Sequence, residues 1–321
     1  CINSFLGRLI WRCINLEISI MAAKKKSLFG AQDLTGIIAP MTTPFTRKGD
    51  VDEGAFRKQV NFLIETGVHG LAVGGSTGEG HTLSTKEATR LVRIAMTEAK
   101  GRVPVVAGII VDSTQQAIER AEAVADLGPA ALQITPVHYL FRPDDNHMLE
   151  HFRTVGRATK IPILIYNVIP WSYLSPALLI RILKEIPQVV GVKQSAGDMK
   201  LLADLLLGAP KGSRIMSAVD ALMYPSFAIG AHGAIAAILT AAPAAQVKLW
   251  DLVQAGEHEA ARRLHEKLLV LWNAMIDDNL PATVKFALSE QGVPGGYPRA
   301  PMPAASTAQQ RAIGRALKKL I

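Results

Sequence analysis

The sequence predicts an α/β protein built on a (β/α)8 barrel with a helical C-terminal extension. Short apolar runs recur along the chain, and amphipathic segments with helical periodicity lie between them. Eight such units fit within about 210 residues, as a (β/α)8 barrel requires. A doubly wound open sheet is the competing architecture. However, the sequence lacks the GxGxxG fingerprint that usually marks the first turn of such a sheet.

Each candidate strand is short and rich in Val, Ile, Leu and Ala, and turn-forming residues bound it. Because such strands lack a polar face, they are typical of parallel strands buried on both sides. The candidate strands are Gly36–Pro40, Gly70–Val73, Pro104–Ile110, Ala130–Ile134, Pro162–Tyr166, Val189–Lys193, Arg214–Ala218 and Gly233–Ile238.

Helices are expected between the strands and again after the last of them. One begins at a capping box formed by Ser84 and Glu87. After the eighth strand the pattern changes to helices alone, over about 261–275, 281–291 and 308–320. We expect these three helices to form an extension packed beside the barrel.

The chain divides into three expected regions, which are an N-terminal extension over 1–33, the barrel over 34–245 and a helical region over 246–321. The first twenty residues are too short and too charged for a membrane span, and they lack a clean signal-peptide core. We expect the part before Met21 to be non-native or disordered, as upstream read-through or a loose extension.

Composition limits the class of partner. The formal net charge is +8, but the basic clusters are short and terminal and show no aromatic interleaving, so no nucleic-acid or membrane partner is expected. The two cysteines, Cys1 and Cys13, provide no disulfide framework, which favours a cytoplasmic location. The histidines are scattered, so no metal site is expected.

Lys193 is the most informative residue, because it ends a buried, β-branched run and small polar residues follow it. A lysine rarely lies in a core without a partner or a function. Desolvation favours the neutral amine, which can act as a nucleophile on a carbonyl compound and form a Schiff base. The alternative is a strand-end lysine that extends to solvent.

Two further groups follow strand ends, where the active site of a barrel lies. The run GGSTGEG after the second strand places Gly75, Ser76 and Thr77 in a turn suited to a carboxylate, and no GK[ST] follows to make it a P-loop. Tyr166 ends the fifth strand and could relay protons. Asp220, after the seventh, would face the same opening. The alternatives are an ordinary glycine turn and a core tyrosine.

The motifs that carry these residues resemble those of the dihydrodipicolinate synthase and N-acetylneuraminate lyase family. They are VGGSTGEG at 73–80, ILIYNVIP at 163–170 and GVKQSAGD at 191–198, and the resemblance extends from about Leu34 to the C-terminus. It implies a class I aldolase-type lyase in a TIM barrel that needs no cofactor, and by family analogy a homotetramer.

The resemblance also implies a role for each residue. Lys193 would form an iminium with pyruvate or a longer 2-oxo acid, and Tyr166 would move the protons. Ser76 and Thr77 would hold the carboxylate. His138 takes the place of a tyrosine that completes the proton relay in the family, with Tyr139 next to it, and either could serve.

The sequence departs from both named branches of the family. The synthase branch has an arginine after the tyrosine of the fifth strand, whereas this stretch reads VIPWSY at 168–173. The lyase branch has an acidic pair where Asp220 is followed by Ala221. Arg142 and Trp171 are candidates to line a pocket for the second substrate.

The leading interpretation is a Schiff-base aldolase or dehydratase acting on a 2-oxo acid, with an unidentified aldehyde as partner. The enzyme alternatives are 4-hydroxy-tetrahydrodipicolinate (dihydrodipicolinate) synthase and N-acetylneuraminate lyase. The alternative without turnover is a sensor that binds a 2-oxo acid. A phosphate-binding barrel enzyme is less favoured, because no second glycine-rich cradle follows strand seven or eight.

Overall fold

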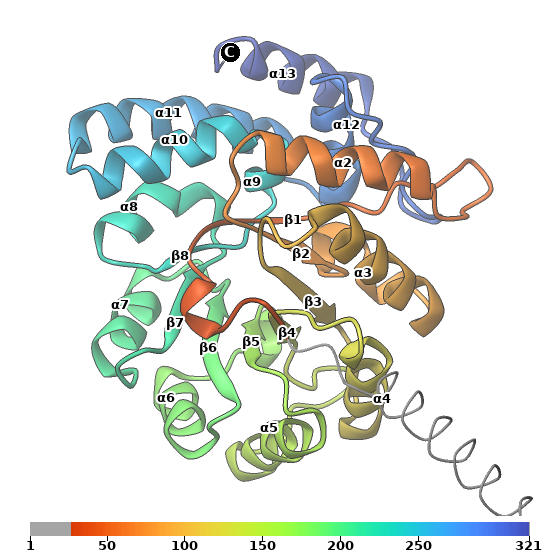
Figure 1. The fold of residues 1–321 in the computed structure, drawn as a ribbon. Helices are drawn as coiled ribbons and strands as arrows, with labels where there is room; N and C mark the ends of the chain where they lie inside the picture. The colour runs from red at the N-terminus through yellow and green to blue at the C-terminus, as the bar shows by residue number, and fades with distance from the viewer. Residues whose placement is uncertain (1–26, 321) are drawn as a thin grey trace, which may run out of the picture.

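The computed structural model describes residues 27–320, and the expectations for the first twenty residues lie outside this part of the chain. Eight parallel strands close into a barrel in sequence order, and the pairing of the first strand with the eighth completes it (Figure 1). The strands are β1 (Gly36–Pro40), β2 (Gly70–Val73), β3 (Val105–Ile109), β4 (Ala131–Ile134), β5 (Ile163–Asn167), β6 (Val189–Gln194), β7 (Arg214–Ser217) and β8 (Gly233–Ala234).

The predicted barrel is therefore confirmed, and seven of the eight candidate strands agree with the structure to within one residue at each end. The expectation that the eighth strand runs on to Ile238 is wrong, because β8 ends at Ala234. Asp220 accepts a hydrogen bond of 2.7 Å from the backbone N–H of Ile238, where a short helix begins. This contact stabilises a helical turn where the apolar sequence predicts extended chain.

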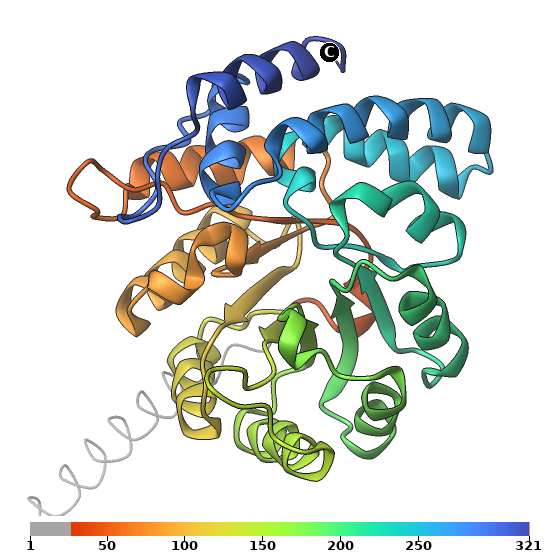
Figure 2. The ribbon, with the colours of Figure 1, turned by 180° about the vertical axis from the view of Figure 1, so that it is seen from behind.

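Helices cover the outside of the barrel (Figures 1 and 2). Capping side chains begin several of them, including Ser84, which forms the predicted box with Glu87. The helices of the barrel are α2 (Glu53–Glu65), α3 (Thr85–Ala99), α4 (Thr114–Ala125), α5 (Asp145–Thr159), α6 (Pro176–Glu185), α7 (Met199–Gly208), α8 (Met223–Ala228), α9 (Ile238–Ala241) and α10 (Pro243–Gln254).

The C-terminal extension consists of α11 (His258–Met275), α12 (Leu280–Ser289) and α13 (Thr307–Leu317). The expected boundary at residue 245 falls inside α10, which packs on β1 and α8 as a helix of the barrel, so the extension begins after it. The loop between α12 and α13 returns to the barrel, where Tyr297 pairs with Phe45. The extension is therefore joined to the barrel at the end where the strands finish.

The core has two parts, which follow from the alternation of side chains along each strand. One face of each strand packs against the helices in a large apolar cluster. The other face fills the barrel with side chains such as Ile38, Val106, Leu164 and Met216. Because Leu164 points inward, Tyr166, two residues later on the same face, points inward as well.

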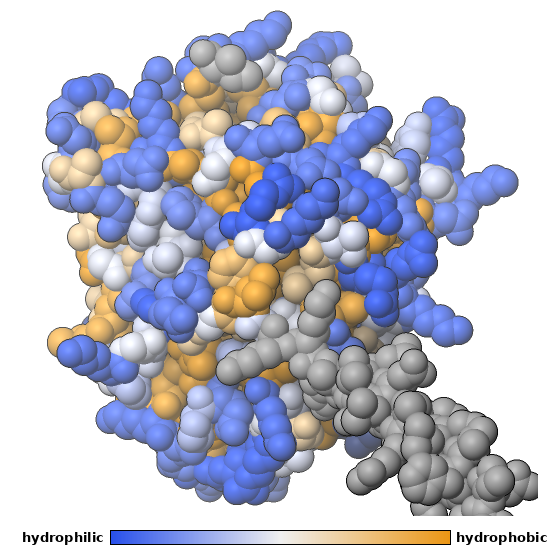
Figure 3. All heavy atoms as spheres, viewed as in Figure 1, coloured by the Kyte–Doolittle hydropathy of each residue, from blue (hydrophilic) through white to orange (hydrophobic). Residues whose placement is uncertain are grey.

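The opposite end of the barrel, where the strands begin, is covered by η1 (Ala31–Asp33), where Arg214 donates hydrogen bonds to the carbonyls of Ala31 and Gln32. The surface in the view of Figure 1 is mostly hydrophilic with scattered apolar patches (Figure 3). In the part of the chain that the structure describes, no helix is long and apolar enough to span a bilayer.

Candidate active site

Lys193 lies near the end of β6 with its side chain buried, at 4% exposure. The strand register pairs it with Tyr166 on β5 and with Met216 on β7. Its Nζ lies 3.6 Å from the centroid of the Tyr166 ring. Within residues 27–320 no carboxylate forms an ion pair with this amine. The amine is thus held inside the barrel mouth against an aromatic face.

Tyr166 connects Lys193 to the turn after β2. Its hydroxyl donates a hydrogen bond of 3.1 Å to Oγ of Ser76. The phenol is 4% exposed, so it is almost fully enclosed. Tyr166 therefore contacts the amine on β6 through its ring face and the turn after β2 through its hydroxyl. A phenol in this position is suited to moving a proton to or from a group bound at Lys193.

The turn after β2 forms two short 3-10 helices, η2 (Ser76–Gly78) and η3 (Gly80–Thr82). Gly74 enters it with φ of +78°, which favours glycine. A Cβ at Gly80 would collide with the carbonyl oxygen of Gly74, so the turn can close this tightly only around glycine. The geometry places Ser76 and Thr77 on the wall of the central cavity. Gly75 precedes η2 and is not part of that wall.

Glu79 fixes this turn from behind. Its side chain is fully buried, and its backbone has φ of +53°. Its carboxylate forms an ion pair with the buried Lys285 of α12 and accepts a hydrogen bond of 2.8 Å from the backbone N–H of Arg299. Burial lowers the pKa of Lys285, and the Glu79 carboxylate opposes that shift. The contacts tie the turn to the C-terminal extension.

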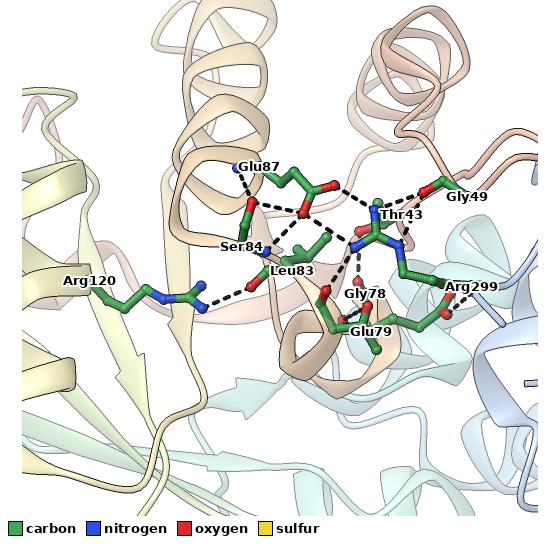
Figure 4. A network of polar contacts seen from close by, with 10 residues as sticks. Thr43, Gly49, Gly78, Glu79, Leu83, Ser84, Glu87, Arg120 and Arg299 are labelled. Carbon is green, nitrogen blue, oxygen red and sulfur yellow. Dashed lines mark hydrogen bonds and ion pairs between the residues drawn. The ribbon is translucent and has the colours of Figure 1, made fainter. Parts of the chain in front are cut away.

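The guanidinium of Arg299 extends this network (Figure 4). It donates to both carboxylate oxygens of Glu87 and to the carbonyls of Gly49 and Thr82. All five of its N–H donors are thereby used. Hydrogen bonds from Arg299 lower the pKa of Glu87 to about 2, so the pair is ionised at neutral pH.

Asp220 follows β7 in a short 3-10 helix, η5 (Asp220–Leu222). One carboxylate oxygen accepts the Ile238 N–H, and the residue also lines the central cavity. Burial raises the pKa of Asp220 to about 6, although the backbone hydrogen bond and the positive charge of Lys193 act in the opposite direction. This carboxyl group can therefore exist in either protonation state close to neutral pH.

These residues meet in one cavity of about 320 Å3 at the carboxyl ends of the strands. Ser76, Thr77, Tyr166, Lys193 and Asp220 all line it, as the sequence predicted. Other lining residues were not identified from the sequence. They are His81, Val168, Ser195, Ala218, Ile235, Ala236, Ala237, Asp278, Leu280, Pro281 and Met302.

The unforeseen residues differ in how well the sequence could have identified them. Ser195 lies two residues beyond Lys193, so strand alternation could have placed it at the same mouth. Asp278, Leu280, Pro281 and Met302 come from the C-terminal extension. Nothing in the sequence marks that extension as part of a site.

The candidates for the second-substrate pocket and the relay lie outside this cavity. Tyr139 and Trp171 are 67% and 70% exposed, and neither they nor Arg142 and His138 line it. His138 and Tyr139 are held by Asp112, which accepts their backbone N–H groups. Trp171 donates from Nε1 to the carbonyl of His138 at 3.0 Å. These residues form an exposed surface beside the mouth.

Among residues 27–320 no cluster of three or more potential ligands could hold a metal ion. The site instead offers a buried amine, a phenol and a hydroxyl-lined turn inside a (β/α)8 barrel. That set defines a class of enzyme, the lyases that form a Schiff base between a lysine and a carbonyl substrate.

Comparison with known proteins agrees with this class. Residues 33–320 match the dihydrodipicolinate synthetase family, and the chain belongs to that family. A 4-hydroxy-tetrahydrodipicolinate synthase of Methanopyrus kandleri is 34% identical over 291 residues, which cover 89% of this chain and 96% of the relative. A 4-hydroxy-tetrahydrodipicolinate synthase of Bradyrhizobium diazoefficiens is 36% identical over 274 residues, which cover 85% of this chain and 89% of the relative. The protein is thus a class I aldolase-type lyase, and the sensor interpretation is set aside.

Solved structures share the fold. A putative dihydrodipicolinate synthetase from Pseudomonas aeruginosa superimposes with a TM-score of 0.85 at 30% identity, over 90% of this chain and all of that one. CdNal from Clostridium difficile, crystallised in complex with mannosamine, gives a TM-score of 0.83 at 26% identity, over 90% and 99% of the two chains.

Proposed function

We propose that this lyase is an aldolase that joins pyruvate to an aldehyde, or cleaves the corresponding longer 2-oxo acid, through an enamine on Lys193. The observation that carries the proposal is the position of the buried Lys193 amine against Tyr166, whose hydroxyl is bonded to Ser76. An amine, a proton carrier and a carboxylate holder are the three groups that this chemistry requires.

In the proposed reaction the neutral Lys193 amine adds to C2 of pyruvate, and loss of water forms an iminium. Removal of a proton from C3 leaves its electron pair in an enamine. The enamine C3 attacks the aldehyde carbon, a C–C bond forms, and the aldehyde oxygen takes up a proton. Water then hydrolyses the new iminium and releases the amine. Tyr166 carries these protons.

The pyruvate carboxylate is placed at the turn after β2. Ser76 and Thr77 supply hydroxyl groups on the cavity wall, and Gly75 is assigned to the same binding turn directly before them. The placement puts the carboxylate at one side of the cavity and leaves the side formed by the C-terminal extension for the second reactant. Asp220 is assigned to substrate binding on the cavity wall.

The second candidate is the synthase activity, which the names of the curated relatives favour. That activity joins pyruvate to aspartate semialdehyde, which is a carboxylated aldehyde. Among the described residues, Lys193 is the lone lysine or arginine that lines the cavity. The absence of a further cationic group there favours an aldehyde without a carboxylate, and so favours the aldolase.

A direct test measures pyruvate consumption with a panel of aldehydes and with aspartate semialdehyde. The proposal expects at least one uncharged aldehyde to be turned over with a higher kcat/KM than aspartate semialdehyde. A kcat/KM that is highest for aspartate semialdehyde would establish the synthase instead. Lys193→Ala should abolish turnover of every substrate.

Of three further parts of the proposal, the first two rest on the family resemblance and the third on the absence of a disulfide framework in the sequence. The third member of the relay is His138 or Tyr139, both of which lie outside the cavity of their own chain, and comparison of His138→Ala with Tyr139→Phe separates the two by their kcat. The assembly is a homotetramer, which sedimentation measures. The enzyme is cytoplasmic, which fractionation of the source cells would check.

A further inference from the structure

A second cavity, of about 510 Å3, adjoins the catalytic one. His81, Asp278 and Met302 line both cavities, so these three side chains form the partition between them. Lys193 lies on the catalytic side of this partition, and the second cavity extends away from it between the turn after β2 and the C-terminal extension. A reactant longer than the catalytic cavity would pass His81, Asp278 and Met302.

The chemistry of the second cavity excludes a carboxylate as its preferred ligand. Among the described residues, the one arginine or lysine that lines it is Arg299, whose five N–H donors are already used by Glu87 and two backbone carbonyls. Three carboxylate residues, Glu79, Asp277 and Asp278, also line it, and Glu79 is already paired with Lys285. An anionic tail would therefore meet like charges without a free cation to offset them.

The side chains of Asp278 and His81 differ from their neighbours Asp277 and Asn279, whose side-chain oxygens accept hydrogen bonds from Gln309. Asp278 is exposed at the partition, and within the described chain its carboxylate accepts no hydrogen bond and forms no ion pair. His81 is also exposed, and its ring has no hydrogen-bond partner among residues 27–320. Both residues line the two cavities. A carboxylate that accepts and an imidazole that can donate or accept are suited to binding hydroxyl groups.

We propose that Asp278 and His81 determine the specificity for the second reactant, which is an uncharged aldehyde whose hydroxyl groups bind at these two side chains and whose chain extends past Met302 into the second cavity. This inference rests on the proposed aldolase function and names the class of its unidentified substrate. It assigns to the C-terminal extension a direct part in substrate selection.

The experiment compares aldehydes of similar size with the full-length enzyme and pyruvate, using glyceraldehyde and erythrose as hydroxylated members, butanal as the apolar member and succinic semialdehyde as the anionic member. The wild-type enzyme should have its highest kcat/KM for a hydroxylated member. Asp278→Asn should raise KM for glyceraldehyde and erythrose about tenfold, the usual effect of losing one charged hydrogen bond, and should lower KM for succinic semialdehyde.

Three further variants complete the test. Met302→Phe narrows the passage and should raise KM for erythrose more than for glyceraldehyde. Asp126→Asn is the matched control, because Asp126 precedes β4 at the opposite end of the barrel, and this variant should leave all KM values unchanged. If Asp278→Asn folds poorly, His81→Ala tests the same subsite from the other chain segment.

The outcomes separate this inference from the proposed function. If pyruvate and borohydride still label Lys193 in the Asp278→Asn variant, its catalytic side is intact. The specificity assignment alone would be overturned by either of two results. One is an Asp278→Asn variant that is labelled but has the same relative KM values for the four aldehydes as the wild-type enzyme. The other is a wild-type enzyme that prefers succinic semialdehyde. A wild-type enzyme that pyruvate and borohydride do not label would overturn the proposed function itself.

Discussion

At the scale of single residues, the site depends on two inward-facing side chains on neighbouring strands. The β5–β6 register sets Tyr166 directly beside Lys193, and strand alternation turns both into the barrel. The sequence could predict this pair, because a buried run ending in lysine and a second run ending in tyrosine fix both position and face.

Tyr166→Phe tests the phenol's role. The ring that packs against Lys193 remains, while the hydroxyl that donates to Ser76 is lost. We expect kcat to fall by about 10²–10⁴, the usual contribution of general acid–base catalysis, whereas pyruvate still forms an adduct on Lys193. Steady-state kinetics with borohydride trapping measures both, and an unchanged kcat would contradict the proton-relay role.

Asp220 should impose a pH dependence on stability. Its carboxyl has a pKa of about 6 in the folded protein because it is buried, and near the ordinary value of about 3.9 when the chain unfolds. Between about pH 4 and 6 the unfolded state holds fewer protons at this group, so its contribution lowers the free energy of unfolding as pH rises. Asp220→Asn should remove that decrease.

Urea unfolding of the wild-type protein and the Asp220→Asn variant at several pH values measures this effect. The difference between the two unfolding free energies should change between about pH 4 and 6 and be constant above that range. Parallel pH profiles throughout would show that the Asp220 carboxyl titrates alike in the folded and unfolded states.

At the scale of elements, the turn after β2 depends on α12 and the loop that follows it. The sequence predicted a glycine turn here, but it could not identify Lys285 and Arg299 as the partners that hold Glu79 in it. Both lie more than 200 residues away in the chain. Local sequence patterns predict contacts between residues that are close in the chain. The contacts of Glu79 with Lys285 and Arg299 depend instead on how the C-terminal extension folds back onto the barrel.

Glu79→Gln should be strongly destabilising. It removes the countercharge of Lys285 and leaves a buried ammonium without its carboxylate, which costs about 3–5 kcal/mol. Chemical unfolding should show this loss. Adding Lys285→Met to the variant should recover part of it, because the unpaired charge is then removed as well.

The matched control for Glu79→Gln is Arg90→Ala, which breaks the exposed ion pair between Arg90 and Glu53. Exposed pairs contribute about 0–1 kcal/mol, so the control should change stability little. Equal losses in Glu79→Gln and the control would contradict the assignment of Glu79 and Lys285 as a buried pair that holds the turn.

At the scale of the whole molecule, the sequence led us to expect a C-terminal extension that only packs beside the barrel. In the structure the extension also forms part of the site. Asp278, Leu280, Pro281 and Met302 form one side of the catalytic cavity. Hydrophobic periodicity predicted the three helices of the extension, but it carries no information on how a helical unit docks. The side of the cavity assigned to the second reactant was therefore the part that the sequence could not predict.

The central claim is that the Lys193 amine forms a Schiff base with a 2-oxo acid. The most direct measurement is to incubate the protein with pyruvate, reduce it with borohydride and locate the added mass by peptide mass spectrometry. The account predicts one adduct, on the peptide containing Lys193, and none in Lys193→Ala. The absence of an adduct in the wild-type protein, or its persistence in Lys193→Ala, would contradict the claim.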